Sequence, residues 1–125
     1  MSITTNQTIE PVSIPGIQHR TLAGAAKDGL KSMEMWHQVI DAGMPTPPHY
    51  HDCEEIVVVL RGGGTLKIEG QDDATFTAGQ TLVLAPNVVH QIINTGDEAL
   101  ELVAAVGMAP IEAFLPDGER IDLPW

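Results

Sequence analysis

Short apolar segments separated by turn-forming residues run along most of this chain. Between the segments lie sequences such as AGMPTPP, RGGG and NTGDE, whose glycine, proline and asparagine residues predict turns. Strand-like patterns, which alternate apolar and polar residues or form short β-branched runs, occupy residues 32–41, 55–60, 65–69, 74–77, 81–85, 88–94 and 99–106. Strands at this spacing predict an all-β sandwich or barrel.

Little of the chain favours a helix. Residues 23–32 (AGAAKDGLKS) can form one or two helical turns, because their glycines disfavour a longer helix. The 125 residues are enough for a single domain with one core, spanning 1–125. We expect the first 20 residues and the tail 110–125 to pack on the barrel or on a second subunit.

Charge narrows the classes of partner. The chain carries 17 acidic against 6 basic residues, for a net charge of −11, and the bases are scattered. Binding to phosphate groups needs clustered bases, so neither nucleic acid nor an anionic membrane is expected as a partner. No apolar run approaches a membrane span, and the N-terminus lacks the pattern of a signal peptide. With Cys53 as the single cysteine, these features predict a cytoplasmic protein.

The stretch HYHDCEE, residues 49–55, contains candidate metal ligands. On a strand, residues i and i+2 face the same side, so His49 and His51 can point at one ion, and His90 on a separate strand can join them. Imidazole and carboxylate groups bind Zn, Fe, Mn, Ni or Cu. Glu55 would lie about 13 Å beyond His51 in an extended strand. It can therefore share the ion only if the chain bends or if Glu55 begins a returning strand.

The other two histidines are weaker candidates. We expect His19, in a turn-rich region, to be solvated. His37 alternates with Met33, Met35 and Val39, which favours a core or rim histidine, with a substrate-contacting role as the alternative. Trp36 lies on the opposite face of this strand from His37. Only one of the two faces can line the cavity of a barrel.

Two motifs resemble those of the cupin family. The first motif, residues 43–62, has Gly43, His49, His51, Glu55 and Gly62 at the family's spacing. In the second, residues 79–94, the matching positions are Gly79, His90 and Asn94. Asn87 occupies the position where the family usually has glycine, and asparagine tolerates a left-handed backbone better than other non-glycine residues.

The resemblance implies a double-stranded β-helix, or jelly-roll barrel, around one divalent metal ion. It assigns His49, His51, Glu55 and His90 as the metal ligands and places Glu55 on the returning strand. If Glu55 points inward, so do Val57 and Val59. Ile92 should share the inward face of His90, and either Leu82 and Leu84 or Val83 should complete an apolar wall.

Open coordination positions suggest an enzyme acting on a small, largely apolar oxygen-bearing compound. We predict a dioxygenase-type oxidoreductase with Fe or Mn in preference to Ni or Zn, and with Glu55 and His37 as candidate catalytic residues. A redox-neutral isomerase, epimerase or lyase and a non-enzymatic small-molecule-binding protein are the alternatives. We expect Cys53 to point away from the metal and Tyr50 to point outward.

A homodimer is expected, because an exposed edge strand needs covering and small cupins commonly exchange N-terminal strands.

Overall fold

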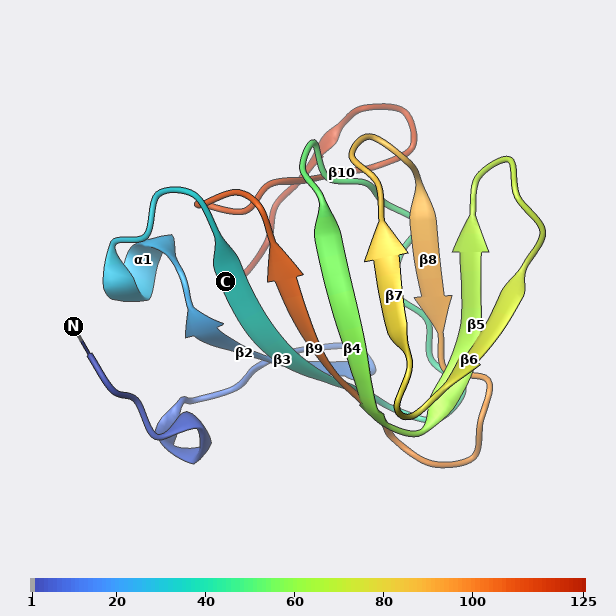
Figure 1. Ribbon diagram of the computed structural model, residues 1–125, viewed down its shortest axis with the longest axis horizontal. Helices are drawn as coiled ribbons and strands as arrows, with labels where there is room; N and C mark the ends of the chain where they lie inside the picture. Colours follow the sequence, from blue (N-terminus) through green and yellow to red (C-terminus); the bar gives the residue numbers. More distant parts are fainter. Residues whose placement is uncertain (1) are drawn as a thin grey trace.

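Antiparallel strands in two facing sheets form the body of the protein (Figure 1). The computed structural model describes residues 2–125. The strands are β1 (Val12–Ile14), β2 (Ile17–Ala23), β3 (Glu34–Ile40), β4 (Glu55–Arg61), β5 (Gly63–Ile68), β6 (Ala74–Thr77), β7 (Thr81–Leu84), β8 (His90–Ile93), β9 (Leu100–Val106), β10 (Ala113–Phe114) and β11 (Arg120–Ile121). The helical segments are the 3-10 helix η1 (Asn6–Thr8) and the single turn α1 (Ala25–Asp28).

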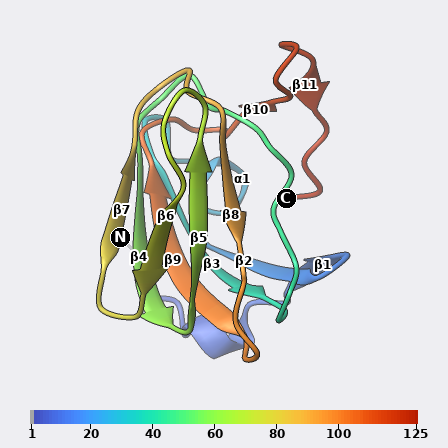
Figure 2. The ribbon, with the colours of Figure 1, turned by 90° about the vertical axis from the view of Figure 1, so that its right-hand side faces the viewer.

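The strand order is that of a jelly roll. The larger sheet has the order β1-β2-β3-β9-β4-β7, and the smaller sheet has the order β6-β5-β8. Figure 2 shows the smaller sheet in front of the larger one. Strand β9 lies between β3 and β4 in the larger sheet, although it follows both of them by many residues. The predicted all-β jelly-roll barrel is confirmed.

Alternation along the strands sets which side chains enter the barrel. In β4, Val57 and Val59 are buried, whereas Ile56 and Val58 are exposed. In β7, Leu82 and Leu84 are buried and Val83 is 70% exposed. The sequence left that choice open, and pairing of β7 with β4 decides it, because Leu84 lies opposite Glu55 and Leu82 opposite Val57.

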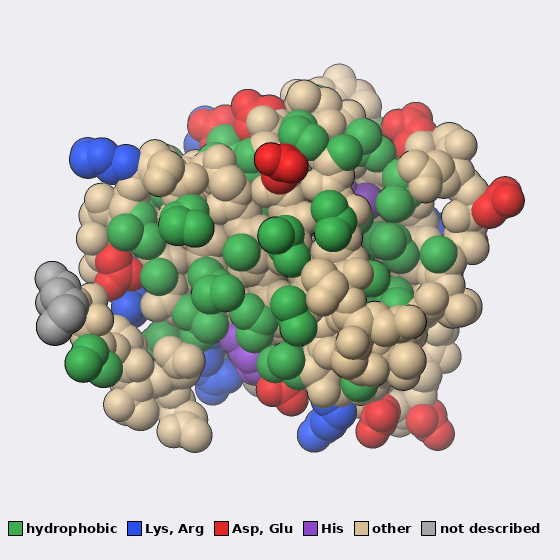
Figure 3. Space-filling view, viewed as in Figure 1, with side chains coloured by type: hydrophobic (Ala, Val, Ile, Leu, Met, Phe, Trp, Pro, Cys, Tyr) green, Lys and Arg blue, Asp and Glu red, His purple; other side chains and the backbone are tan. Residues whose placement is uncertain are grey.

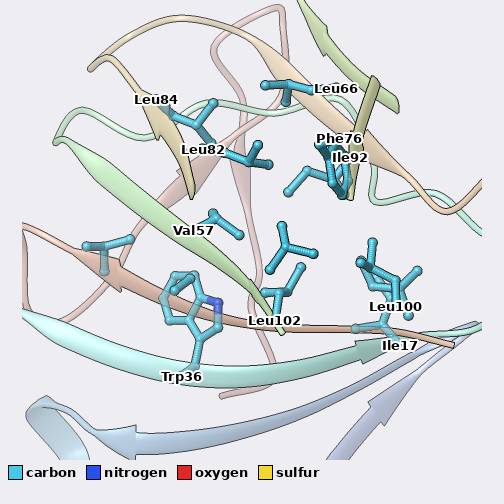
Figure 4. Packing of buried hydrophobic residues seen from close by; sticks show 14 of the residues in the cluster. Ile17, Trp36, Val57, Leu66, Phe76, Leu82, Leu84, Ile92, Leu100 and Leu102 are labelled. Carbon is cyan, nitrogen blue, oxygen red and sulfur yellow. The ribbon is translucent and has the colours of Figure 1, made fainter. Parts of the chain in front are cut away.

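Apolar side chains from both sheets meet in the core (Figure 4). The labelled side chains of Figure 4 come from β2, β3, β4, β7 and β9 of the larger sheet and from β5, β6 and β8 of the smaller one. Asn94, fully buried at the end of β8, donates hydrogen bonds to the carbonyls of Ile40 and Glu98. The core and this amide connection fix β8, which begins at His90.

The turn before β8 needs an unusual backbone. Asn87 has φ 61°, in the left-handed region, and its N–H donates to the carbonyl of His51. The prediction that Asn87 replaces glycine in this turn is confirmed, and the turn ties the two histidine-bearing segments together.

The N-terminal region is more regular than predicted. Residues of β1 and β2 form a hairpin, and β2 pairs along β3 of the same chain. Alternation in IQHRTLA, residues 17–23, was the signal for this strand. Gly16, at φ 78°, makes the tight turn that produces the hairpin.

The tail packs on the same chain. Strand β10 pairs with β11, and the Trp125 ring stacks on the His19 ring at 3.8 Å with 10° between their planes. Within residues 2–125, no helix has the length and apolar character that crossing a membrane requires.

Candidate metal centre

Three histidines converge at one end of the barrel. The segment carrying His49 runs antiparallel beside β8, where the backbone of His49 exchanges two hydrogen bonds with that of His90. His51 follows two residues later. One ring nitrogen from each of these three histidines lies within 4.8 Å of the other two. Strand pairing thus brings together residues that are about 40 positions apart in the sequence.

Each of these rings is oriented by a backbone carbonyl. The Nδ1 atoms contact the carbonyls of Pro47 for His49, of Glu112 for His51 and of Val88 for His90, at 2.7, 2.7 and 3.1 Å. A carbonyl can only accept, so each Nδ1 carries a hydrogen, and in the neutral ring Nε2 keeps its lone pair. Backbone partners of this kind commonly fix the tautomer of metal-binding histidines.

Glu55 adds a carboxylate to the cluster. It begins β4, as the returning-strand expectation requires, and its Oε1 lies 3.3 Å from Nε2 of His90 and 3.7 Å from Nε2 of His51. This oxygen is buried and has no hydrogen-bond partner among the described residues. An unpartnered buried carboxylate oxygen is costly, and a divalent ion shared with the imidazoles would satisfy it.

The surroundings keep His49 neutral. Burial, followed by the neighbouring His90 ring, lowers the pKa of His49 to about 4. A metal ion requires the unprotonated imidazole, so His49 is ready to bind at neutral pH. Three imidazoles and one carboxylate make a donor set that fits a divalent transition metal.

An apolar cavity of about 180 Å³ opens beside the cluster. Its polar lining beyond the four candidate ligands comes from Gln38, Thr46 and Asp122, and its aromatic walls come from Trp36 and Trp125. The C-terminal residues 121–125 form one side. The aliphatic lining consists of Ile14, Ile17, Val57, Ile92, Leu102, Ala104, Ile121, Leu123 and of prolines 47 and 124.

His37 does not lie at this centre. It faces the outer side of β3, where its Nε2 lies 3.0 Å from Oε1 of Glu101, while Trp36 is only 5% exposed and lines the cavity. The period of the strand turns one of these two neighbours inward, and the aromatic residue is the one buried. This placement removes the geometric support for His37 as a catalytic residue.

The expectation of a solvated His19 was wrong. His19 lies on the inward face of β2 and is 1% exposed. Its Nδ1 accepts a hydrogen bond from Nε2 of Gln38 at 3.1 Å, and its Nε2 donates to the Thr21 hydroxyl at 2.9 Å. Burial lowers the pKa of His19 to about 4. His19 therefore supports two cavity walls, Gln38 and Trp125, from behind.

Cys53 and Tyr50 lie away from the cavity lining. The Tyr50 ring stacks on Phe114 of β10 at 5.2 Å. Cys53 is partly buried against the core, and this burial raises the pKa of its thiol. A thiol held protonated is a poor metal ligand, which agrees with the expectation that Cys53 points elsewhere.

Comparison with known proteins connects the site to a family. The family model described as auxin binding protein matches residues 4–122. Auxin-binding protein 1 of Arabidopsis thaliana is 36% identical over 110 residues, which make up 81% of this chain and 55% of the relative. The chain thus spans about half the length of this curated relative.

Solved structures show the same fold. A cupin-like protein from Thermotoga maritima aligns at TM-score 0.66 and 24% identity, covering 73% of this chain and 68% of that one. A recombinant oxalate oxidase in complex with glycolate aligns at TM-score 0.75 and 20% identity, covering 90% and 62%. These likenesses confirm the cupin fold predicted from the two motifs.

Proposed function

Because the chain belongs to the auxin-binding protein family, we propose that it binds a small, largely apolar carboxylate through a divalent metal ion. His49, His51, Glu55 and His90 would hold this ion. The observation that carries the proposal is the convergence of three oriented imidazoles with the unpartnered oxygen of Glu55 beside an apolar cavity.

The metal would supply a positive charge with open coordination positions. Four protein donors leave one or two positions free on a five- or six-coordinate ion, and an anionic oxygen is a suitable ligand for them. The chain has a net charge of −11 and would repel anions in general. The positive charge of the metal ion would overcome this repulsion at the site. No lysine or arginine lines the cavity within residues 2–125, so the ion is the anchor that the site offers to a carboxylate.

The cavity walls would select the body of the ligand. Trp36 and Trp125 present aromatic surface, and Val57 and Leu102 present aliphatic surface. An aromatic or branched ligand would be bound by burial of its apolar area, at about 25 cal/mol per Å². Auxin is the ligand that the relatives' names give, and its aromatic ring and carboxylate suit these two features.

Two polar groups are placed to orient the ligand. The Thr46 hydroxyl oxygen accepts from the backbone N–H of Ile92, which leaves its O–H free to donate into the cavity. Gln38 donates one N–H to His19 and lines the cavity, and its amide has a second N–H that can donate. Both side chains are held by the fold and can hydrogen-bond a carboxylate or ring nitrogen.

Dioxygenase chemistry is the second candidate. The open coordination positions and the apolar cavity favour it, since an iron or manganese ion could bind an oxygenated substrate and O₂ together. A redox-neutral isomerase or lyase has less support. Within residues 2–125, the acid–base groups lining the cavity are Asp122 and the four candidate ligands, and His37 lies outside it.

Calorimetric titration with indole-3-acetate tests the binding proposal. Zinc-loaded protein should bind this auxin, whereas metal-free protein and a His90→Ala variant should bind at least about 100-fold more weakly. Indole-3-acetamide, which keeps the ring and lacks the charge, is the matched control and should also bind weakly. Equal binding of acid and amide would contradict the anchoring role of the metal.

Oxygen uptake separates the two candidates. Iron-loaded protein should bind the carboxylate without consuming O₂ if the chain is a binding protein. Stoichiometric oxygen consumption with such a ligand would instead support the dioxygenase.

A further inference from the structure

A second cavity lies on the inward side of β2 and β3. Its volume is about 270 Å³, and α1, β2, β3 and the loop before β10 contribute to its lining. Trp125 lines both this cavity and the one beside the metal centre, so the two share a wall. The ionisable residues of the second lining are Glu10, His19, Lys27 and Glu34, and none of them belongs to the candidate metal site. We call this space the Glu34 cavity.

Glu34 brings a buried carboxylate to this lining. It begins β3, and only 7% of its surface is exposed. Its Oε1 accepts a hydrogen bond from the backbone N–H of Ala25, the first residue of α1, at 2.8 Å. Within residues 2–125, Oε2 has no hydrogen-bond partner and Glu34 forms no ion pair. Because a buried carboxylate is costly without a partner of opposite charge, Glu34 favours a cation in the cavity.

The other residues of the lining do not supply this cation. The Nζ atom of Lys27 lies 3.1 Å from Oδ1 of Asp28 and 3.0 Å from Oγ1 of Thr4. His19 is neutral at pH 7, because burial lowers its pKa to about 4. Exposed Glu10 adds a second carboxylate. The cavity therefore carries negative charge that its own side chains leave uncompensated.

Apolar and aromatic side chains form much of the remaining wall. Ile9, Ile111 and Trp125 contribute to it, and the Trp125 ring is held in place by stacking on the His19 ring at 3.8 Å. An aromatic ring attracts a cation that lies near its face, and aliphatic walls stabilise an apolar body by burying its surface. The walls thus suit an organic cation better than a hydrated inorganic one.

The charge of the whole chain acts in the same direction. A net charge of −11 attracts cations towards the molecule. On the face drawn in Figure 3, apolar side chains gather across the middle, and charged groups stand around the edge. Helix α1, which lines the Glu34 cavity, lies at the edge of the molecule in the same view (Figure 1).

We propose that the Glu34 cavity binds a small protonated amine with an apolar body, whose ammonium group donates to Oε2 of Glu34. The apolar body lies against Ile111 and Trp125. The two cavities differ in the charge that they select, because the metal ion attracts an anionic oxygen and Glu34 attracts a cation. Amine binding needs no metal, so it does not depend on the carboxylate binding proposed above.

Isothermal titration calorimetry of the full chain with benzylamine tests the proposal. The wild type should bind one benzylamine per chain, with the same affinity in zinc and in EDTA. Benzyl alcohol has nearly the same shape and no charge, and it should bind at least about tenfold more weakly, since hydrogen bonds between charged groups are the stronger ones. Absence of benzylamine binding, or equal affinity for the amine and the alcohol, would overturn the proposal.

A charge-removing variant tests the role of Glu34. Glu34→Gln keeps an oxygen that can accept from the N–H of Ala25, and it should weaken benzylamine binding at least about tenfold. Glu69→Gln, at an exposed position after β5 in the other sheet, removes the same net charge and should leave the affinity unchanged. Unchanged affinity in Glu34→Gln would contradict the assignment of this carboxylate.

A blocking substitution tests the location independently of charge. Ala26 is an exposed residue of α1 that lines the cavity. Ala26→Phe should fill part of the space and weaken benzylamine binding at least about tenfold. Far-UV circular dichroism checks that both variants are folded. Wild-type affinity in folded Ala26→Phe would show that the amine binds elsewhere and would overturn the site.

Discussion

Individual side chains at the candidate metal centre are held by hydrogen bonds that the sequence motif does not reveal. Each of the three histidines uses Nδ1 for a backbone carbonyl, so that Nε2 is left for an ion. Two of these carbonyls come from residues two positions away in the same segment, but that of Glu112 comes from the C-terminal region. The motif supplied the ligand types, whereas the folded chain supplies their tautomer.

The effect of a single substitution on zinc affinity should depend on whether the residue lies at the candidate metal centre. We expect His51→Ala and His90→Ala to lower zinc affinity at least about 100-fold, since loss of a group that merely orients a metal ligand already costs about 10- to 100-fold. His37→Ala removes an imidazole outside the centre and should leave the affinity unchanged, as should Cys53→Ser. Competition with a chromogenic chelator measures the zinc affinity of all four variants. Full metal occupancy in His90→Ala would contradict the site.

Burial of His19 should make stability depend on pH. The pKa of His19 is lowered from 6.5 to about 4 in the folded chain, so below pH 6.5 the unfolded chain takes up a proton that the folded chain refuses. This stabilisation is complete above pH 6.5 and disappears as the pH falls towards 4, a loss of about 3 kcal/mol.

Urea unfolding at pH 7.5 and pH 4.5 measures this loss. His19→Gln cannot titrate and keeps hydrogen-bonding capacity, so the wild type should lose about 2 to 3 kcal/mol more than the variant between these pH values. Since His49 titrates in both proteins, the difference isolates His19. Parallel losses in the two proteins would show that His19 is free to protonate when folded.

At the scale of strands, close packing of β5 against β8 positions His90. A Cβ atom at Gly64 would overlap the carbonyl oxygen of Ile93 and press on the Phe76 ring. Gly64 pairs with β6 at one edge of β5, and β8 lies along the other edge. The glycine therefore lets the two strands approach and sets the position of β8.

Gly64→Ala should separate these strands. We expect a loss of about 1 to 3 kcal/mol in the free energy of unfolding, together with weaker metal binding through displacement of His90. Gly96→Ala is the matched control, because a Cβ there would make only an ordinary contact with the Asn94 side chain at 3.5 Å. Thermal unfolding of both variants checks this, and equal stability would contradict the close-packing argument.

Strand patterns predicted most of the sheet but not its pairing. Residues from 55 to 106 alternate clearly, and the predicted segments there match β4 to β9 within a few positions. Strand β2 was missed because Pro15 and Gly16 interrupt the N-terminal pattern. His19 was expected in solvent because its segment was interpreted as turns and not as a strand. For His37 the strand was predicted, but alternation gives two faces and only strand pairing decides which face is inside.

At the scale of the whole molecule, a metal ion at the candidate centre would add a further connection between parts of the chain. Its candidate ligands come from the segment before β4, from β4 and from β8, so binding would join both sheets at one end of the barrel. An ion that binds the folded chain and not the unfolded chain raises stability by mass action.

Chelation should therefore destabilise the protein. At a free zinc concentration of 100 times the dissociation constant, we expect about 2.7 kcal/mol of added stability, seen as a higher Tm in differential scanning calorimetry. EDTA should reverse the shift, and His90→Ala should show little response to either addition. A wild-type Tm independent of both zinc and EDTA would argue against a site that joins the sheets.

The metal content of untagged protein tests most directly whether His49, His51, Glu55 and His90 form one metal site. Protein purified without chelators should contain close to one divalent ion per chain by plasma mass spectrometry, and His90→Ala should contain little. Absence of bound metal in the wild type, even after reconstitution with iron, manganese, nickel or zinc, would contradict the account.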